Sequence, residues 1–338
     1  MIKIHENYSL RKNTTFGNDI AARWFAEPSD IDELEFVLEF SEKKNLPVLV
    51  IGEGSNLLFL NDYEGLVIRP AYAGLEVIEQ SGNEILVRVG SGENWDSFVE
   101  RCVGKEWYGP ENLSLIPGAV GAAPVQNVGA YGVEAADIID QVEVYDRTIQ
   151  KQVVFTSEDC MFGYRDSIFK HVEAGRHVVL NVIFRLSLTS SLKLDYGNVR
   201  EVYSGKSEGG LKALRESIIE IRSGKLPDPS EYGNAGSFFK NPVISEFQYH
   251  EIKKTWENIP KYPFGDGTVK IPAAWLIEKS GMKGIRKGAV GTWPSQPLVI
   301  VNYGDASGKD LYDFSESIQQ AVRDKFGIEL DREVRIIS

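Results

Sequence analysis

One long, nearly uncharged segment limits the folds open to this chain more than any other feature. Residues 108–132, YGPENLSLIPGAVGAAPVQNVGAYG, show neither helical nor strand periodicity. A compact domain rarely keeps about 20 residues without regular structure unless they are functional or disordered, and the many small residues here do not favour disorder. The segment therefore predicts a loop packed against a bulky ligand. A buried loop with only a structural role is the alternative.

The strands predicted around this loop occur in clusters. Apolar and β-branched runs predict strands at 46–51, 66–70, 75–80, 84–90, 141–146, 151–156, 177–187 and 332–338 and for LVIVN. Helices are predicted at 29–44, 95–107, 211–224 and 310–327 and for IPAAWLIEKSG. Ser29 and Asp32 have capping-box spacing at the start of the first helix. Gly224 and Pro227 predict the end of the helix at 211–224 and a domain boundary after it. Because helices do not alternate strictly with strands, the order favours an α+β architecture.

The charge of the chain limits its partners. A net charge of −12 and a pI near 5.0 do not favour a nucleic-acid or anionic-membrane surface, which needs clustered Lys and Arg. The N-terminal residues MIKIHENYSLRKNTTF lack the apolar core of a signal peptide. No run approaches the roughly 20 apolar residues of a membrane span. We expect a cytoplasmic protein with no nucleic-acid or membrane partner.

Cysteine and histidine residues offer no recognisable metal site. Cys102 and Cys160 are the only cysteines, and without a CxxC motif they are expected to be free thiols. The four histidines show no HExxH or other ligand spacing, so we expect no metal.

Three short motifs carry candidate chemistry. GEGSN (52–56) follows a buried strand and suits close approach of the backbone to a phosphate, although it lacks the third glycine of the dinucleotide fingerprint and an ordinary turn is the alternative. In GNAGSFFKNP (233–242), Ser237 has no neighbouring histidine, which makes a proton donor more plausible than a nucleophile, with a turn residue as the alternative. Arg165 in GYRDS has the group best shaped to grip a carboxylate.

Together these segments resemble the UDP-N-acetylenolpyruvoylglucosamine reductases, of the type I branch. The resemblance rests on IGEGSNLLF, LIPGAVGAAPVQNVGAYGVE, GYRDS, KLPDP with GNAGSFFKNP, DYGNV, and a C-terminal REVR. It implies an α+β fold of the vanillyl-alcohol-oxidase type, with two FAD-binding lobes and an α+β substrate-binding domain. The implied domains are 1–70 with the C-terminal strand 328–338, then 71–224, then 225–327.

The resemblance also implies a reaction. NADPH would reduce a non-covalently bound FAD, and the enolpyruvyl group of UDP-N-acetyl-3-O-(1-carboxyvinyl)-glucosamine would be reduced to UDP-N-acetylmuramate, a peptidoglycan precursor. Ser237 would protonate C2, Arg165 would stabilise the charge that grows on the substrate carboxylate, and Glu333 would organise the site. We expect a monomer.

Further site residues are implied by position in the matching motifs. The expected substrate contacts are Tyr164, Tyr196, Lys225, Asn241 and Gln296. The expected FAD contacts are Gly52, Gly54, Ser55, Asn56, Pro117, Gly118, Gly121, Gln126, Asn127, Gly129, Ala130, Tyr131 and Arg335. Relatives often carry a serine where this chain has Ala122 and Ala123, so one phosphate contact is expected to be missing.

Two other functions remain open from the sequence. One is a flavin oxidase of the same superfamily that acts on an alcohol or sugar. GNAGSFFKNP does not favour it, and no histidine lies in the expected flavin loops, where such oxidases commonly attach FAD. The other is a binding module without catalysis, which the presence of Arg165, Ser237 and Glu333 does not favour.

Overall fold

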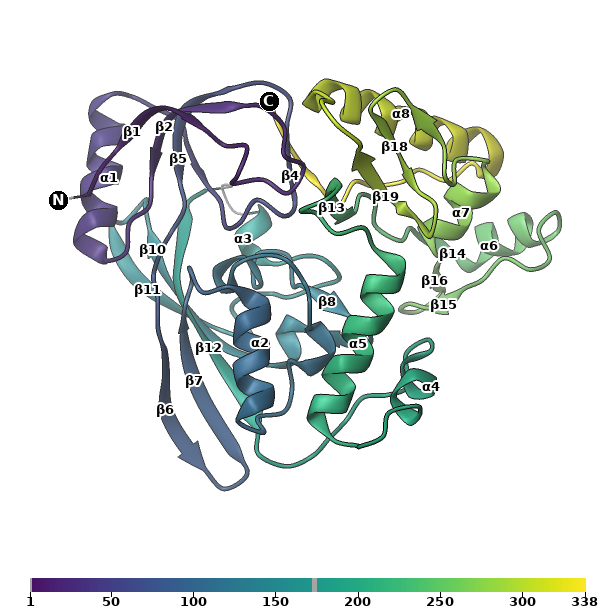
Figure 1. Cartoon of the computed structure of the whole chain (residues 1–338), viewed down its shortest axis with the longest axis horizontal. Coiled ribbons are helices and arrows are strands. Elements are labelled where there is room, and N and C mark those ends of the chain that lie inside the picture. The colour runs from purple at the N-terminus through teal and green to yellow at the C-terminus, as the bar shows by residue number, and fades with distance from the viewer. Residues whose placement is uncertain (1, 172–174) are drawn as a thin grey trace. The chain divides into compact units, whose positions relative to one another are not determined.

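The chain folds so that each of two units is assembled from separate stretches of sequence (Figure 1). The computed structural model describes residues 2–171 and 175–338. Unit 1 comprises Met1–Tyr8, Ala22–Gly54 and Glu64–Ser223, and unit 2 comprises Ser9–Ala21, Ser55–Tyr63 and Gly224–Ser338. The division of the chain into two FAD-binding lobes and a substrate-binding domain stays a prediction.

The first sheet of unit 1 is covered by helix α1 (Ile31–Lys43). Its strand order is β1 (His5–Ser9), β2 (Ala21–Ala26), β5 (Tyr63–Ile68) and β3 (Val48–Val50). Leu34, Val37 and Leu38 of α1 pack in one core with Leu66 and Ile68 of β5. These helix positions lie one turn apart, which is why the apolar spacing predicted the helix correctly.

The start of α1 differs from the prediction by one residue. Asp30, not Ser29, is the N-cap, and its carboxylate accepts the backbone N–H of Glu33 at 2.8 Å. Glu33 in turn accepts the N–H and the hydroxyl of Ser29, at 3.0 and 2.9 Å. The predicted pairing of Ser29 with Asp32 was therefore wrong, because two adjacent cap-forming residues compete and the acidic one satisfies the helix end.

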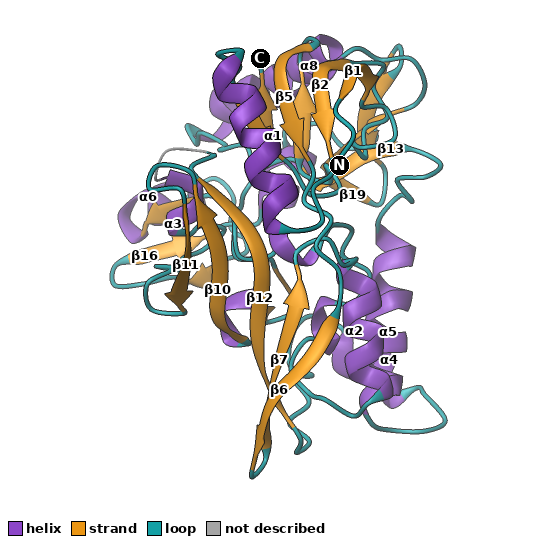
Figure 2. Ribbon diagram, turned by 90° about the vertical axis from the view of Figure 1, so that its left-hand side faces the viewer, coloured by secondary structure: helices purple, strands orange, loops and turns teal. Residues whose placement is uncertain are grey.

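The second sheet of unit 1 is wholly antiparallel and strongly twisted (Figure 2). Its strand order is β11 (Lys151–Thr156), β10 (Ile139–Asp146), β12 (His177–Ser187), β7 (Glu84–Gly90) and β6 (Leu75–Ser81). One face is buried against α2 (Trp95–Gly104), where Trp95 and Phe98 meet Phe184 of β12. All five strands and α2 were predicted, with small differences at their ends.

Helix α5 (Leu211–Lys225) lies beside α2 in both ribbon views (Figures 1 and 2). Arg215 of α5 forms two hydrogen bonds with Asp96 of α2, at 2.7 and 2.9 Å. Contrary to the prediction, α5 continues through Gly224 to Lys225. Glycine only weakens a helix, whereas the following Pro227 disfavours helical backbone at the residue before it.

Asp96→Asn is expected to lower the free energy of unfolding by about 2 kcal/mol at neutral pH, since Arg215 would lose its anionic partner. Burial alone would raise the pKa of Asp96, but hydrogen bonds from Arg215 and from the backbone of Leu115 outweigh it and lower the pKa. This stability is present above the unfolded pKa of about 3.9 and is lost as pH falls toward the lower folded value.

Urea unfolding at neutral pH and at about pH 3 measures this effect, and the difference between Asp96→Asn and the parent protein should shrink at the lower pH. Glu220→Gln is the matched control, because its salt bridge with Lys206 lies on the surface and is worth about 0.5 kcal/mol or less. A difference that stays the same at both pH values would contradict the prediction.

Unit 2 contains a four-stranded antiparallel sheet packed against two helices. The strand order is β13 (Gly233–Ser237), β19 (Gln296–Asn302), β18 (Val290–Trp293) and β17 (Arg286–Lys287), and the helices are α7 (Ala273–Lys279) and α8 (Gly308–Phe326). Leu298 and Ile300 of β19 pack with Leu276 and Ile318 of these helices. Residue Gly327 ends α8 in a left-handed conformation, as C-cap glycines do.

Two smaller groups of strands complete unit 2. The sheet β14 (Val243–Ser245), β16 (Thr268–Lys270), β15 (Tyr262–Pro263) carries α6 (Glu246–Lys253), and none of these elements was predicted. At the C-terminus, β20 (Arg335–Ile337) pairs in parallel with β4 (Leu57–Phe59). The last strand was predicted over 332–338 and is shorter than expected.

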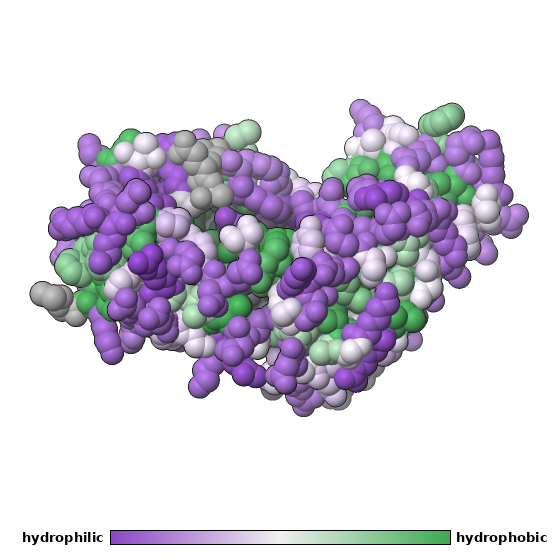
Figure 3. Space-filling model, turned by 90° about the horizontal axis from the view of Figure 1, so that it is seen from above, coloured by the Kyte–Doolittle hydropathy of each residue, from purple (hydrophilic) through white to green (hydrophobic). Residues whose placement is uncertain are grey.

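The content and order of the elements confirm the predicted α+β class. Hydrophilic side chains cover most of the face shown in Figure 3, with smaller apolar patches between them. Within residues 2–171 and 175–338, no helix is long and apolar enough to cross a membrane, and no cluster of three or more His, Cys, Asp or Glu could hold a metal ion.

Candidate active site

The loop predicted at 108–132 contains no regular element longer than three residues. It includes the 3₁₀ helices η1 (Glu111–Leu113) and η2 (Val120–Ala122) and the two-residue strand β8 (Gly129–Ala130), which pairs with β9 (Val133–Glu134). Four side-chain-bearing residues of the loop and of the GYRDS turn adopt positive φ: Leu115 (59°), Asn127 (46°), Tyr131 (50°) and Arg165 (55°). Such backbone costs free energy and clusters at ligand sites.

The glycine segment GEGSN contacts this loop through Glu53, which was not predicted as a site residue. The Glu53 carboxylate accepts the backbone N–H of Gly118 at 3.0 Å and the side-chain amide of Asn94 at 2.9 Å. A Cβ at Gly121 would lie only 2.5 Å from the Cβ of Ser91, so this turn requires glycine. Ala122 packs its methyl group toward Gly52, at 3.3 Å from a Cβ built there. The two loops thus form a glycine-lined backbone surface.

Asn127 joins the loop to the GYRDS turn. Its buried amide donates to the Glu134 carboxylate at 2.8 Å and to the Gly163 carbonyl at 3.0 Å, and its oxygen accepts the N–H of Ala136 at 2.9 Å. The side chain is therefore engaged in protein contacts. Its position beside Gly163 brings the turn that carries Arg165 against the loop.

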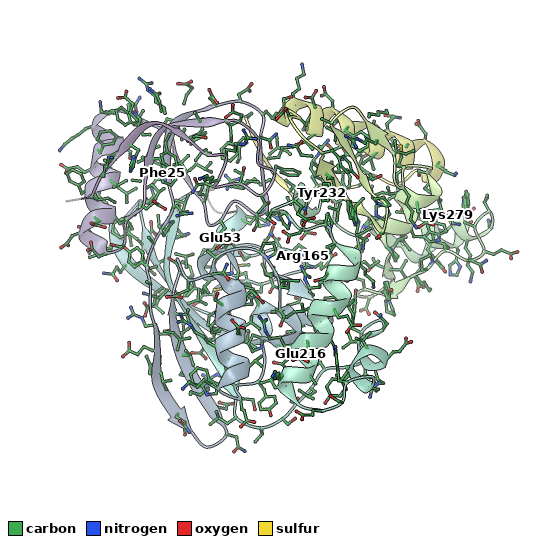
Figure 4. The ribbon with its side chains drawn as sticks, in the orientation of Figure 1. Phe25, Glu53, Arg165, Glu216, Tyr232 and Lys279 are labelled. Atoms are coloured by element: carbon green, nitrogen blue, oxygen red, sulfur yellow. The ribbon has the colours of Figure 1, made fainter. Side chains whose placement is uncertain are left out.

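Arg165, labelled in Figure 4, belongs to unit 1 and contacts the same loop. Its Nη2 donates to the Gly129 carbonyl at 2.5 Å, and its guanidinium lies 5.4 Å from the ring centre of Tyr164. The Arg165 carbonyl accepts the Lys170 ammonium, at 3.0 Å, from the short helix α3 (Ile168–His171). These contacts hold a cation at the surface of the loop, and this arrangement suits an anionic ligand.

Tyr131 and Tyr196 meet edge to face, with ring centres 5.9 Å apart. Burial raises the pKa of Tyr131, whose hydroxyl interacts with Arg222 of α5. Arg222 also donates to the Leu115 carbonyl at 3.3 Å. Tyr196 lies just before α4 (Val199–Ser204) and is 51% exposed. Arg222 was not predicted as a site residue, because arginine in an amphipathic helix is ordinarily a surface residue.

In unit 2, Ser237 ends β13 opposite Val299 of β19, directly after an irregularity in the pairing. Gly236 has φ of 65°, and its N–H is held by the buried side chain of Asn234 at 3.0 Å. Asn234 also donates to the Tyr232 carbonyl at 2.8 Å. Asn234 therefore shapes the turn that presents Ser237. The sequence offered no signal for this role beyond its place in GNAGS.

Glu333 lies beside the Ser237 segment. The N–H of Glu333 donates to the Phe238 carbonyl at 2.9 Å. Asn56 connects to the same C-terminal segment, because its side-chain amide donates to the Glu333 carbonyl at 3.0 Å and its own carbonyl accepts the Arg335 N–H at 3.0 Å. Three segments that are distant in sequence thus converge within unit 2, and they carry a hydroxyl, a carboxylate and an amide.

The remaining predicted residues have less defined surroundings. Asn241 accepts the Ala273 N–H at the start of α7, at 2.9 Å. Gln296 begins β19, and its buried side-chain oxygen has no hydrogen-bond partner within the described residues. Lys225 is exposed at the end of α5. Unit 1 holds Tyr164, Arg165, Tyr196, Gly52, Gly54, Pro117, Gly118, Gly121, Gln126, Asn127, Gly129, Ala130 and Tyr131; unit 2 holds Ser55, Asn56, Lys225, Ser237, Asn241, Gln296, Glu333 and Arg335.

Comparison with known proteins gives matches over nearly the whole chain. An FAD binding domain model matches residues 22–148, and the model of the UDP-N-acetylenolpyruvoylglucosamine reductase C-terminal domain matches residues 228–337. The reductase of that name from Pseudomonas putida is 44% identical over 334 residues, or 98% of each chain. That from Bacteroides fragilis strain YCH46 is 44% identical over 337 residues, or 99% of this chain and 100% of the relative.

A solved structure shows the same overall similarity. The crystal structure of the UDP-N-acetylenolpyruvylglucosamine reductase from Thermus caldophilus aligns with a TM-score of 0.68 and 25% identity, over 100% of this chain and 99% of the other. Together with the FAD-binding match, this similarity confirms the fold of the vanillyl-alcohol-oxidase type that was expected from the sequence.

Proposed function

This chain belongs to the UDP-N-acetylenolpyruvoylglucosamine reductase family, and from this premise we propose that it uses NADPH to reduce the enolpyruvyl group of a UDP-N-acetylglucosamine derivative to UDP-N-acetylmuramate. The chain is an FAD-dependent oxidoreductase. The convergence of Ser237, Glu333 and Asn56 in unit 2 is the observation that carries the proposal. We place the reaction in the cytoplasm, in peptidoglycan precursor synthesis.

The loops of unit 1 fit the dinucleotide. A pyrophosphate needs backbone N–H donors and close approach of the backbone. The turn at Gly121 has no room for a side chain, because a Cβ there would lie 2.5 Å from the Cβ of Ser91, and Gly52 lies tightly against Ala122, at 3.3 Å from a Cβ built on it. We propose that the predicted glycines, with Pro117, Gln126, Ala130 and Tyr131, are FAD contacts. Ser55, Asn56 and Arg335 are proposed as FAD contacts from the resemblance of motifs alone. The buried side chain of Asn127 would act by holding the loop.

The chemistry divides between cofactor and protein. When bound, FAD carries the hydride from NADPH to C3 of the enolpyruvyl group. Reduction leaves carbanion or enol character at C2, and a hydroxyl at Ser237 would supply the proton there. The cationic Arg165 would stabilise the charge on the substrate carboxylate, while Glu333 would organise the site. Tyr164, Tyr196, Lys225, Asn241 and Gln296 are the proposed substrate contacts.

Anaerobic absorbance measurements on the purified flavoprotein test the function. NADPH should bleach the flavin band, and adding the enolpyruvyl nucleotide sugar should restore it and give a product heavier by two hydrogen atoms. Reoxidation by oxygen alone, with no response to the enolpyruvyl compound and with oxidation of an alcohol or sugar, would overturn the proposal in favour of an oxidase.

Gly121→Ala is expected to reduce the FAD retained by the purified protein by about tenfold, because the added methyl group would meet the Cβ of Ser91 at 2.5 Å and displace the loop. The ratio of flavin absorbance to protein absorbance measures the occupancy. Gly104→Ala is the matched control, since a Cβ there meets nothing within 4 Å. Full flavin occupancy in Gly121→Ala would contradict the assignment of this loop to FAD.

A further inference from the structure

Asn112 is a fully buried polar residue with no role in the proposed reaction. It is 0% exposed, and its single side-chain nitrogen donates to two carbonyls, those of Tyr131 and Lys193, each at 2.9 Å. These carbonyls belong to segments far apart in the sequence. One amide group therefore ties the expected flavin loop to the segment that leads to Tyr196.

The position of Asn112 is set independently of these two segments. Its turn, η1, is held by Glu111, whose carboxylate accepts the Gly109 N–H at 2.6 Å, and by Ser114, whose hydroxyl donates to the Glu111 carbonyl at 2.6 Å. The indole of Trp95 donates to the Leu113 carbonyl at 2.9 Å. Asn112 is thus presented from a rigid turn.

The two tied segments meet again at their aromatic rings. The rings of Tyr131 and Tyr196 are 5.9 Å apart at 81°, a geometry that favours aromatic contact. A Cβ at Gly132 would lie 3.6 Å from the Cβ of Tyr196, so Gly132 lies against the side chain of Tyr196. Lys193, three residues before Tyr196, is the point at which Asn112 holds this segment. The orientation of the Tyr196 ring thus depends on a backbone that Asn112 fixes.

We propose that Asn112 is a positioning residue that holds segment 189–198 against Tyr131, so that the Tyr196 ring is presented to the nucleotide part of the substrate. This inference rests on the proposed role of Tyr196 as a substrate contact. Asn112 acts through Tyr196. Without its two hydrogen bonds, the segment populates other conformations. The apparent affinity for substrate then falls in proportion to the remaining population of the binding-competent conformation.

Asn112→Ala is expected to raise the KM for the enolpyruvyl nucleotide sugar about tenfold, the effect of losing one to two hydrogen bonds. Flavin occupancy and the rate of flavin reduction by NADPH should stay within about twofold, whereas a merely structural role would lower both together with the melting temperature. If the alanine variant does not fold, the same measurements are made on Asn112→Gln, which keeps an amide group on a longer side chain.

A double-mutant cycle with Tyr196→Ala separates the possible outcomes. If Asn112 acts through Tyr196, Asn112→Ala has little further effect on KM once Tyr196 is truncated. An Asn112 effect that adds in full to that of Tyr196→Ala would overturn the positioning role while leaving Tyr196 as a substrate contact. An unchanged KM in Tyr196→Ala would overturn the Tyr196 assignment and the inference that rests on it.

Hydrogen exchange gives a readout that does not depend on activity. The backbone amides of 189–198 should exchange about tenfold faster in Asn112→Ala than in the parent protein. Asn181→Ala is the matched control, because it removes a side-chain hydrogen bond between strands β12 and β10 of the same unit, from Asn181 to Glu143. Unchanged exchange in Asn112→Ala would overturn the proposed anchoring.

Discussion

Ser237→Ala is expected to slow reoxidation of the reduced flavin by the enolpyruvyl substrate by about 10²- to 10⁴-fold, the usual contribution of a positioned proton donor. The change removes the hydroxyl at the end of β13 and leaves the neighbouring main-chain hydrogen bond between Glu333 and Phe238 in place. Reduction of the flavin by NADPH should keep its rate, because that step requires no proton at C2. Anaerobic stopped-flow absorbance resolves the two half-reactions.

The control for this prediction is Ser317→Ala in helix α8. This variant likewise removes one serine hydroxyl in unit 2, but outside the site, where the Ser317 hydroxyl donates to the Phe314 carbonyl at 2.6 Å. Both half-reactions should keep their rates in Ser317→Ala. Equal losses in the two half-reactions of Ser237→Ala would show instead that Ser237 supports the structure of the turn.

Gly129→Ala is expected to reduce turnover about 100-fold, the effect of misplacing a catalytic group by about 1 Å. A Cβ at Gly129 would lie 2.8 Å from Nη1 of Arg165 and 2.9 Å from Cγ of Glu134. The flexible guanidinium would give way first, and its hydrogen bond to the Gly129 carbonyl would be lost. Steady-state kinetics with saturating NADPH measure the effect.

Gly104→Ala again provides the comparison, because it adds the same methyl group at a position with open space around it. Turnover in this control should match that of the parent protein. Flavin occupancy distinguishes the causes in Gly129→Ala: a protein that retains FAD and loses turnover supports a role for Arg165, whereas one that loses FAD in proportion to turnover would assign the effect to the loop alone.

The elements with strong periodicity were predictable from the sequence. The apolar spacing of α1, the alternation of buried residues in β7 and the long apolar run of β12 are local patterns, and these elements form where they were predicted. The small sheet of β14, β15 and β16 was not predictable. Its strands are two or three residues long, too short for a periodic pattern, and they form because β16 pairs with the nearby β15 and with β14 further back in the chain.

The candidate site, like the fold, could be predicted only in part. The resemblance of motifs indicated Ser237, Arg165 and Glu333, and the structure places Ser237 and Glu333 in adjacent segments of unit 2. Glu53 and Asn112 were not predicted, because their roles depend on which backbone groups come within hydrogen-bond distance after folding. No local pattern encodes such contacts, since the same residue types are common in ordinary turns.

The parallel pairing of β20 with β4 has a consequence for synthesis in the cell. The residues at 57–59 leave the ribosome long before their partners at 335–337, because the two strands lie far apart in the sequence. Domains generally fold as units during translation, in order of their emergence. Unit 2 therefore cannot be completed until residues 335–337 have emerged, and its early segments must wait for them. A chain cut before residue 335 would leave β4 without its parallel partner.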